Sequence, residues 1–267
     1  MRLSILDHGH RRRAKLFMAL TAKRSGVATP DIVKLLLYRP GVFARPLLEL
    51  TAPAMRGPSY WTAAEREYLA MATAQVHECP FCVVTHTELV RIAGPGELDP
   101  EDPASARPEL RAVRTFVEGV SRDRADAAVV AAVPPHAVAE ALRVNLVWNI
   151  VNRLANAFGF VLREGQLETG TRSLHRFGYR FPGFLIAEGP RTDLAAAAAR
   201  LGDDLPEPLR SYVTTVREAS YRVTDADVEA LKTAGYSEDE IFEATVAAAV
   251  GAALRSFEAA KRAAGAD

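Results

Sequence analysis

Apolar residues recur three or four positions apart along much of this chain, and that spacing most constrains its fold. Leu16 and Leu20 show it near the N-terminus, followed by Ile32, Leu35 and Leu36. This is the period of one face of an α-helix. No segment shows sustained apolar–polar alternation bounded by hairpin turns, the pattern of a half-buried strand. We therefore predict an all-α protein.

Capping and breaking residues place the central helices. Thr62, with Glu65 three residues later, forms a capping-box pattern that predicts a helix running to about residue 76. Pro80 predicts the start of the next helix, because proline favours the first helical position, and Gly94 with Pro95 ends it. We expect loops at 53–58 and 95–108, and further helices at about 108–122, 126–133 and 136–161.

A weak internal repeat is visible at an offset of 99 residues. Leu110 recurs as Leu209, and Phe158 recurs as Phe257. The same offset carries both cysteines onto other residue types, so only the first copy would bear thiols. The expected organisation is an N-terminal helical extension (1–54), a cysteine-bearing helical repeat (55–165) and a degenerate helical repeat (166–267).

The balance of charge excludes a general attraction to polyanions. Lys plus Arg number 33, as do Asp plus Glu, so the formal net charge is zero. We expect no nucleic-acid and no membrane partner. No stretch approaches the roughly 18 apolar residues of a membrane span. The short apolar run at 16–20 is closed by Lys23 and Arg24, which argues against an export signal. We predict a soluble, cytoplasmic protein.

The two cysteines, Cys79 and Cys82, lie three residues apart, which is too close for a disulfide scaffold. If a helix starts here, Cys79 is its N-cap and Cys82 lies in its first turn. Unpaired N–H groups and the helix dipole would then favour thiolate, lowering a thiol pKa by one to several units from about 8.5. The spacing also lets the two sulfurs form a disulfide without large backbone movement.

Two further residues complete a candidate catalytic group. His86 lies four residues after Cys82, one turn along the same helix face, where it could take the thiol proton. Glu67 lies in the middle of the preceding helix. If the two helices pack antiparallel, Glu67 could hydrogen-bond to His86 and fix its tautomer, as the orienting carboxylate does in catalytic triads.

The order Glu67, Cys79, Cys82, His86 resembles the signature of the alkylhydroperoxidase D-like, or carboxymuconolactone decarboxylase, family. Segments 149–156 and 223–236 also resemble its members, and the likeness covers roughly residues 55–265. The best-known peroxidase members carry a His between the cysteines, where this chain has Phe81. The resemblance implies the family's helical fold and a homo-oligomer, as a trimer, hexamer or dimer.

The resemblance also implies a reaction. Cys82 would attack a hydroperoxide and become a sulfenic acid, and Cys79 would convert it into a disulfide. His86 and Glu67 would form the proton relay. A dithiol or dihydrolipoyl-type donor would then reduce the disulfide. No cofactor and no metal are implied.

Other interpretations remain open. Cys79, Cys82 and His86, with His77 or Glu67, could form a structural zinc site, or the thiols could be inert core residues. A decarboxylase-type lyase and a non-enzymatic redox-sensing oligomer are the competing functions. Four asparagines at helical spacing favour hydrogen bonding between helices over a pocket lining: Asn145, Asn149, Asn152 and Asn156.

Overall fold

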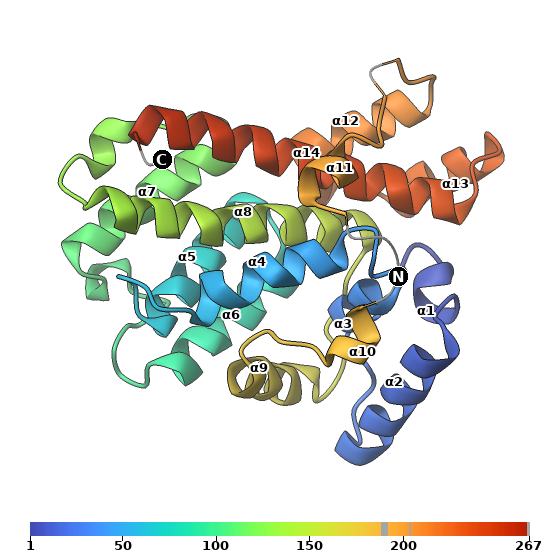
Figure 1. Ribbon diagram of the computed structural model, residues 1–267, viewed down its shortest axis with the longest axis horizontal. Helices are drawn as coiled ribbons and strands as arrows, with labels where there is room; N and C mark the ends of the chain where they lie inside the picture. Colours follow the sequence, from blue (N-terminus) through green and yellow to red (C-terminus); the bar gives the residue numbers. More distant parts are fainter. Residues whose placement is uncertain (188–191, 203, 266–267) are drawn as a thin grey trace. The chain divides into compact units, whose positions relative to one another are not determined.

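The computed structural model describes residues 1–187, 192–202 and 204–265. Within these ranges every regular element is helical and no strand occurs, which confirms the all-α prediction (Figure 1). The α-helices are α1 (Ile5–His8), α2 (Arg12–Ser25), α3 (Asp31–Leu37), α4 (Ala44–Arg56), α5 (Ala63–Val76), α6 (Pro80–Ala93), α7 (Pro108–Ser121), α8 (Pro135–Phe158), α9 (Gln166–Phe177), α10 (Gly183–Ile186), α11 (Leu194–Ala198), α12 (Leu209–Ala219), α13 (Asp225–Thr233) and α14 (Glu238–Ala264). Three short 3₁₀ segments join them: η1 (Pro103–Ser105), η2 (Ala127–Val130) and η3 (Ser220–Arg222).

The chain forms two compact units, each assembled from three separate stretches. Unit 1 comprises Met1–Leu48, Arg153–Gly170 and Phe181–Ala252. Unit 2 comprises Glu49–Asn152, Thr171–Arg180 and Ala253–Asp267. These two units are defined by spatial compactness. The predicted segments 1–54, 55–165 and 166–267 were defined instead by a repeat in the sequence, and that repeat stays a prediction.

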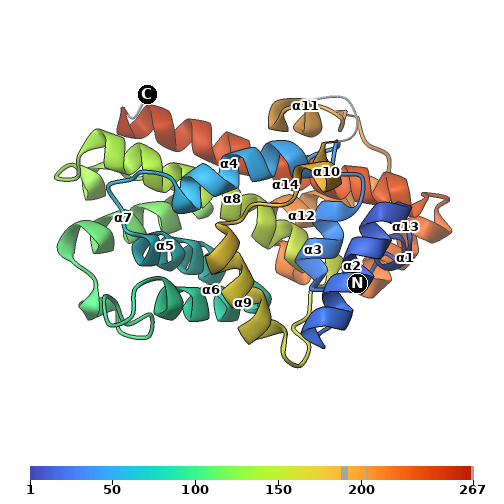
Figure 2. The ribbon, with the colours of Figure 1, turned by 60° about the horizontal axis from the view of Figure 1, so that its bottom comes forward.

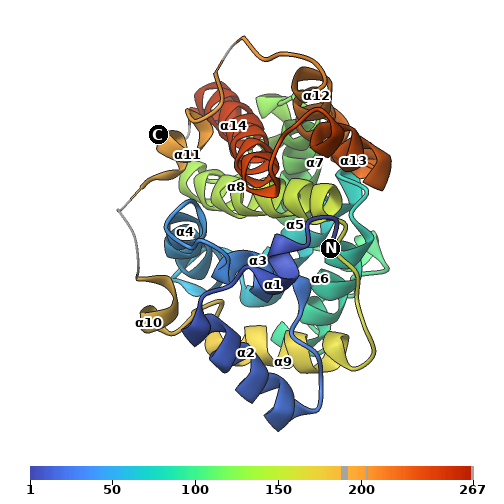
Figure 3. The same cartoon turned by 90° about the vertical axis from the view of Figure 1, so that its right-hand side faces the viewer.

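Unit 1 has an aromatic core centred on Phe242, which is fully buried. Phe158 stacks on its ring at a centroid distance of 5.9 Å, and Tyr38 meets it edge-on at 5.0 Å. Tyr212 of α12 hydrogen-bonds to Thr245 of α14 at 2.7 Å. Helix α12, helix α13 and the first part of α14 pack together in this unit (Figure 3).

Unit 2 is built around α5, which packs along α6 (Figures 1 and 2). Every residue of α5 from Ala64 to Ala74 is buried, and these include three charged side chains: Glu65, Arg66 and Glu67. A buried charge is costly unless it is paired and hydrogen-bonded. Each of these three charged side chains therefore needs hydrogen-bond or ion-pair partners within the folded protein.

The ends of the two central helices lie where the sequence predicted them. The Thr62 hydroxyl accepts a bond from the Glu65 backbone N–H at 3.2 Å, and the Glu65 carboxylate accepts one from the Thr62 N–H at 2.9 Å. The predicted capping box is therefore present. Helix α6 begins at Pro80 with Cys79 as its N-cap.

Two local predictions were wrong. The loop expected at 53–58 begins only at Gly57, because α4 continues through Pro53 to Arg56, and the Gly57 N–H closes its last turn on the Pro53 carbonyl at 2.8 Å. The helix expected at 126–133 is reduced to the short 3₁₀ segment η2. Pro134 follows it and disfavours helical geometry in the preceding residue.

Among the residues that the structure describes, no helix is both long enough and apolar enough to cross a bilayer.

Candidate functional site

The two thiols lie at the N-terminus of α6, in unit 2. Cys79 is the N-cap, with extended backbone angles (φ −101°, ψ 92°), and Cys82 lies in the first helical turn. Both are free cysteines and both are buried, with 1% and 2% of their surface exposed. Cys79 is close enough to Cys82 to influence its ionisation. The structure thus places both thiols at the start of one helix, and formation of a disulfide between them stays a prediction.

The prediction of a lowered thiol pKa was wrong for Cys82. Burial raises the pKa of the Cys82 thiol well above its usual value, and the hydrogen bond and charge of Cys79 raise it further. A helix N-terminus stabilises an anion by about 0.3–1 kcal/mol, and by at most ~2 kcal/mol. Full burial can shift a pKa by about 3–5 units, which is a larger effect. Cys82 therefore rests as a thiol, and a base must remove its proton.

A candidate base lies on the same helix. His86 is one turn beyond Cys82 and is buried, and its Nδ1 lies 2.7 Å from Oε2 of Glu67 on α5. A carboxylate only accepts, so Nδ1 carries the hydrogen that it donates to Glu67, and Nε2 is the other ring nitrogen. The structure brings Glu67 and His86 together as expected. Their catalytic role stays a prediction.

Glu67 has two further partners that the sequence analysis missed. Nη2 of Arg56, at the end of α4, donates to Oε1 at 2.5 Å. The Tyr179 hydroxyl donates to the carboxylate, at 2.8 Å from Oε1 and 2.9 Å from Oε2. Arg56 was assigned to a loop, and Tyr179 lies 112 residues after Glu67 with no motif around it. Only the folded chain reveals either contact.

These partners determine the ionisation of Glu67. Burial raises the pKa of its carboxyl group. The hydrogen bond and charge of His86, the charge of Arg56 and the hydrogen bond of Tyr179 outweigh burial, so the pKa lies below its ordinary value. The pKa of Tyr179 is raised well above normal by burial and by the charge of Glu67. The site therefore contains a buried carboxylate and a neutral phenol.

The aromatic ring of Trp148 packs against two of these side chains, His86 and Tyr179. Trp148 of α8 meets the His86 ring edge-on, with centroids 4.0 Å apart, and meets the Tyr179 ring at 5.9 Å. The Arg56 guanidinium lies 5.1 Å from the centre of the Tyr179 ring. The Trp148 indole N–H points to the Met55 sulfur at 3.2 Å. Trp148 therefore packs directly against the imidazole.

A second buried polar chain adjoins the motif. Nε2 of His77 lies 2.5 Å from Oδ1 of Asn149, and the Asn149 amide donates to Asn145 at 3.0 Å. Asn145 in turn donates to Ser121 of α7 at 2.8 Å and to Thr73 of α5 at 3.0 Å. The expectation of hydrogen bonds between helices is confirmed for Asn145, and Asn149 bonds within α8 and to His77, the C-cap residue of α5. His77, which was given no catalytic role from the sequence, belongs to this chain of buried polar groups.

The remaining asparagine of this helix face in unit 2 is Asn152. Its side chain is buried, and neither of its amide atoms has a hydrogen-bond partner among the described residues.

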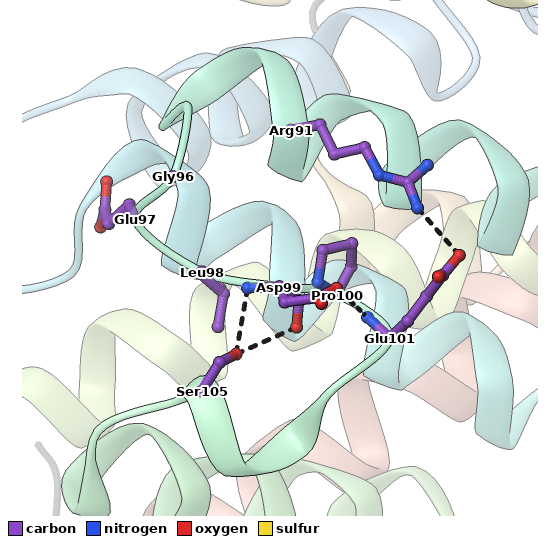
Figure 4. Close-up of a pocket in the computed structure, with 8 residues that line it drawn as sticks. All are labelled: Arg91, Gly96, Glu97, Leu98, Asp99, Pro100, Glu101 and Ser105. Atoms are coloured by element: carbon purple, nitrogen blue, oxygen red, sulfur yellow. Dashed lines mark hydrogen bonds and ion pairs between the residues drawn. The ribbon is translucent and has the colours of Figure 1, made fainter.

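A surface hollow in unit 2 lies apart from the thiols, in the loop between α6 and α7 (Figure 4). Two of its charged side chains form an ion pair, in which Arg91 donates to Glu101 at 2.8 Å. The Ser105 hydroxyl also accepts a hydrogen bond from the Asp99 N–H at 3.0 Å. The hollow is lined by Arg91, Gly96, Glu97, Leu98, Asp99, Pro100, Glu101 and Ser105. None of these is a predicted site residue.

The alternative of a zinc site is not supported by the geometry. In residues 1–187, 192–202 and 204–265, no three or more His, Cys, Asp or Glu side chains are grouped so that they could hold a metal ion. Glu67 instead pairs with Arg56, Tyr179 and His86, and the thiols pair with each other.

Comparison of the sequence with models of known protein families gives no match, and comparison with curated proteins gives none either.

Proposed function

We propose that this protein is a dithiol peroxidase of the alkylhydroperoxidase D-like type, a thiol–disulfide oxidoreductase that reduces hydroperoxides through a Cys79–Cys82 disulfide. One observation carries the proposal. Two neighbouring thiols, one at the N-cap and one in the first turn, begin a helix that also bears an imidazole hydrogen-bonded to a buried carboxylate. The arrangement supplies a nucleophile, a second thiol, a base and a group that orients the base.

The peroxide step uses Cys82 as nucleophile. His86 takes the thiol proton, and the sulfur attacks the terminal oxygen of the hydroperoxide, so that an S–O bond forms and the O–O bond breaks. The departing alkoxide takes the proton back from His86 and leaves as an alcohol. Sulfur is oxidised and the peroxide oxygens are reduced, which leaves Cys82 as a sulfenic acid.

The second step uses Cys79. Its thiol loses a proton to His86, and the sulfur attacks the Cys82 sulfur, so that the S–S bond forms and the S–O bond breaks. The hydroxide that leaves takes the proton from His86 and departs as water. An external dithiol, of dihydrolipoyl or similar type, then reduces the disulfide by thiol–disulfide exchange and regenerates both thiols.

The direct test is the product of one oxidation. We expect the reduced protein, treated with one equivalent of an organic hydroperoxide, to lose two hydrogens and to release one alcohol and one water. Peptide mass spectrometry should place the crosslink between Cys79 and Cys82. Recovery of two unmodified thiols after prolonged exposure to hydroperoxide would refute the proposal.

The raised pKa of Cys82 predicts how its thiolate depends on pH. Because the pKa in the folded protein lies above the ordinary value of 9.0, the thiolate is a minor species below that pH and forms only above it. Titration of the thiolate ultraviolet absorbance should show an inflection above pH 9.0 that is missing in Cys82→Ser and that returns toward the ordinary value on denaturation. An inflection assigned to Cys82 near neutral pH would contradict this expectation.

A further inference from the structure

Three donor groups converge on the Glu67 carboxylate, and the single hydroxyl hydrogen of Tyr179 is shared between the two carboxylate oxygens. Its Oε1 accepts from Arg56 at 2.5 Å and from Tyr179 at 2.8 Å, and its Oε2 accepts from His86 at 2.7 Å and from Tyr179 at 2.9 Å. A guanidinium has no acceptor, and a carboxylate offers about four lone-pair positions. A proton added to Glu67 would remove the negative charge that these donors stabilise, and Arg56 could not accept a bond from the new O–H. This environment suits a carboxylate and disfavours a carboxylic acid.

The backbone that presents Tyr179 is strained. Tyr179 has φ +64° and follows Gly178 at φ +58°, so two successive residues lie in the left-handed region. A bulky side chain rarely adopts this conformation, and such strain persists where surrounding contacts determine it. The same turn lies against Arg56, whose guanidinium is 5.1 Å from the centre of the Tyr179 ring. The turn at 178–179 therefore carries one hydrogen-bond partner of Glu67, Tyr179, and lies against a second, Arg56.

We propose that Tyr179 and Arg56 are positioning residues that keep Glu67 a carboxylate throughout the reaction cycle, so that His86 alone carries the proton. This inference rests on the proposed function and departs from the relay that the family resemblance implies, since Glu67 then stabilises the imidazolium and takes no proton itself. Each proton leaves a thiol for His86 and returns from His86 to the alkoxide or hydroxide.

The groups facing Glu67 agree with this role. Arg56 faces it from α4, His86 from α6 and Tyr179 from the stretch after α9. Arg66, its neighbour on α5, is a second buried cation that interacts with it. The lowered pKa of Glu67 follows from the hydrogen bond and charge of His86, the charge of Arg56 and the hydrogen bond of Tyr179, which together outweigh burial.

The test follows the Glu67 carboxyl carbon by NMR in protein labelled at glutamate, with the resonance assigned by its loss in Glu67→Gln. At neutral pH we expect the chemical shift of a carboxylate in both the reduced and the disulfide form. The shift of a carboxylic acid in either form would overturn the proposal. This readout needs no turnover, so it stays informative if the protein proves not to consume hydroperoxide.

The same resonance tests Tyr179 against a matched control. Tyr179→Phe keeps the ring and removes the donor, so the titration midpoint of Glu67 should rise by about one pH unit. Tyr68→Phe removes a hydroxyl that is bonded to Arg114 in the same unit, and it should leave the midpoint unchanged. Arg56→Gln should raise it further, and Arg56→Lys should restore it in part. If the titration midpoint of Glu67 does not move in Tyr179→Phe and Arg56→Gln, the assignment of Tyr179 and Arg56 as positioning residues is overturned.

Measurement of hydroperoxide turnover distinguishes a positioning role of Tyr179 from a purely structural one. Tyr179→Phe should lower kcat with little change in KM and should move the acid limb of the pH–rate profile upward, in step with the Glu67 midpoint. A fall in kcat without movement of that limb would show that Tyr179 only packs, and would contradict the proposal. If turnover is present but Glu67 becomes protonated during the cycle, the inference fails while the proposed function stands.

Discussion

Replacing Cys82 by Ser is expected to lower hydroperoxide turnover by several orders of magnitude, because removal of the nucleophile removes the bond-forming step itself. A serine hydroxyl has nearly the size of the thiol and cannot be oxidised by a hydroperoxide. Turnover is measured as peroxide consumed in the presence of a small dithiol. Wild-type activity in Cys82→Ser would refute the assignment of Cys82 as the attacking thiol.

Cys79→Ser is the matched variant, since it removes the adjacent thiol and leaves Cys82 in place. It should react with one equivalent of hydroperoxide and then stop, with Cys82 as a sulfenic acid that a dimedone-type reagent captures. Wild-type protein should give little of that adduct, because Cys79 converts the sulfenic acid into a disulfide. If capture occurs at Cys79 in Cys82→Ser and not at Cys82 in Cys79→Ser, the roles of the two thiols are reversed.

The largest effect on stability is expected for Glu67→Ala. The substitution leaves a buried cavity and removes the partner of Arg56, Tyr179 and His86 at once. Breaking a buried charge pair in this way typically costs about 3–5 kcal/mol in the free energy of unfolding. Chemical denaturation measures it. Glu118→Ala is the control, because Glu118 forms a partly exposed pair with Arg114 four residues away, and it should cost only about 0.3–0.5 kcal/mol.

The effect of Glu67→Ala should depend on pH with a definite sign. The folded-state pKa of Glu67 lies below its ordinary value of 4.5, so the ionised group stabilises the fold fully at pH values above 4.5. That stabilisation is lost as the pH falls through the folded-state value. The stability difference between wild type and Glu67→Ala should therefore be largest near neutral pH and should shrink below pH 4.5. A difference that grows on acidification would contradict the direction of the pKa shift.

The features that the sequence predicted well depend on neighbours in the chain. The capping box at Thr62 and the helix start at Pro80 are encoded within three or four residues, so propensity and spacing suffice. The contact between Glu67 and His86 spans 19 residues, but both lie on helices joined by a short connection, so their meeting could be anticipated.

The features that were missed depend on burial and on distant contacts. The helix start predicted an acidic thiol at Cys82, but the sequence does not show that α6 begins inside a packed unit, where loss of solvent outweighs the helix dipole. Tyr179 could not be found, because nothing near it in sequence marks it as a partner of a carboxylate 112 residues earlier. Arg56 was missed because Pro53 suggested that the helix had already ended.

The separation between Glu67 and Tyr179 has a consequence for the protein as it is made. At a synthesis rate of about 5–20 residues per second, ribosomes add the intervening 112 residues in roughly ten seconds. During that interval α5 and α6 can pair, but the carboxylate lacks its phenol donor. Newly made chains should therefore pass through a stage in which the incompletely hydrogen-bonded Glu67 carboxylate weakens the packing of α5 against α6. Nascent protein halted before residue 179 should be cleaved more readily by proteases, and bound more readily by chaperones, than the finished chain.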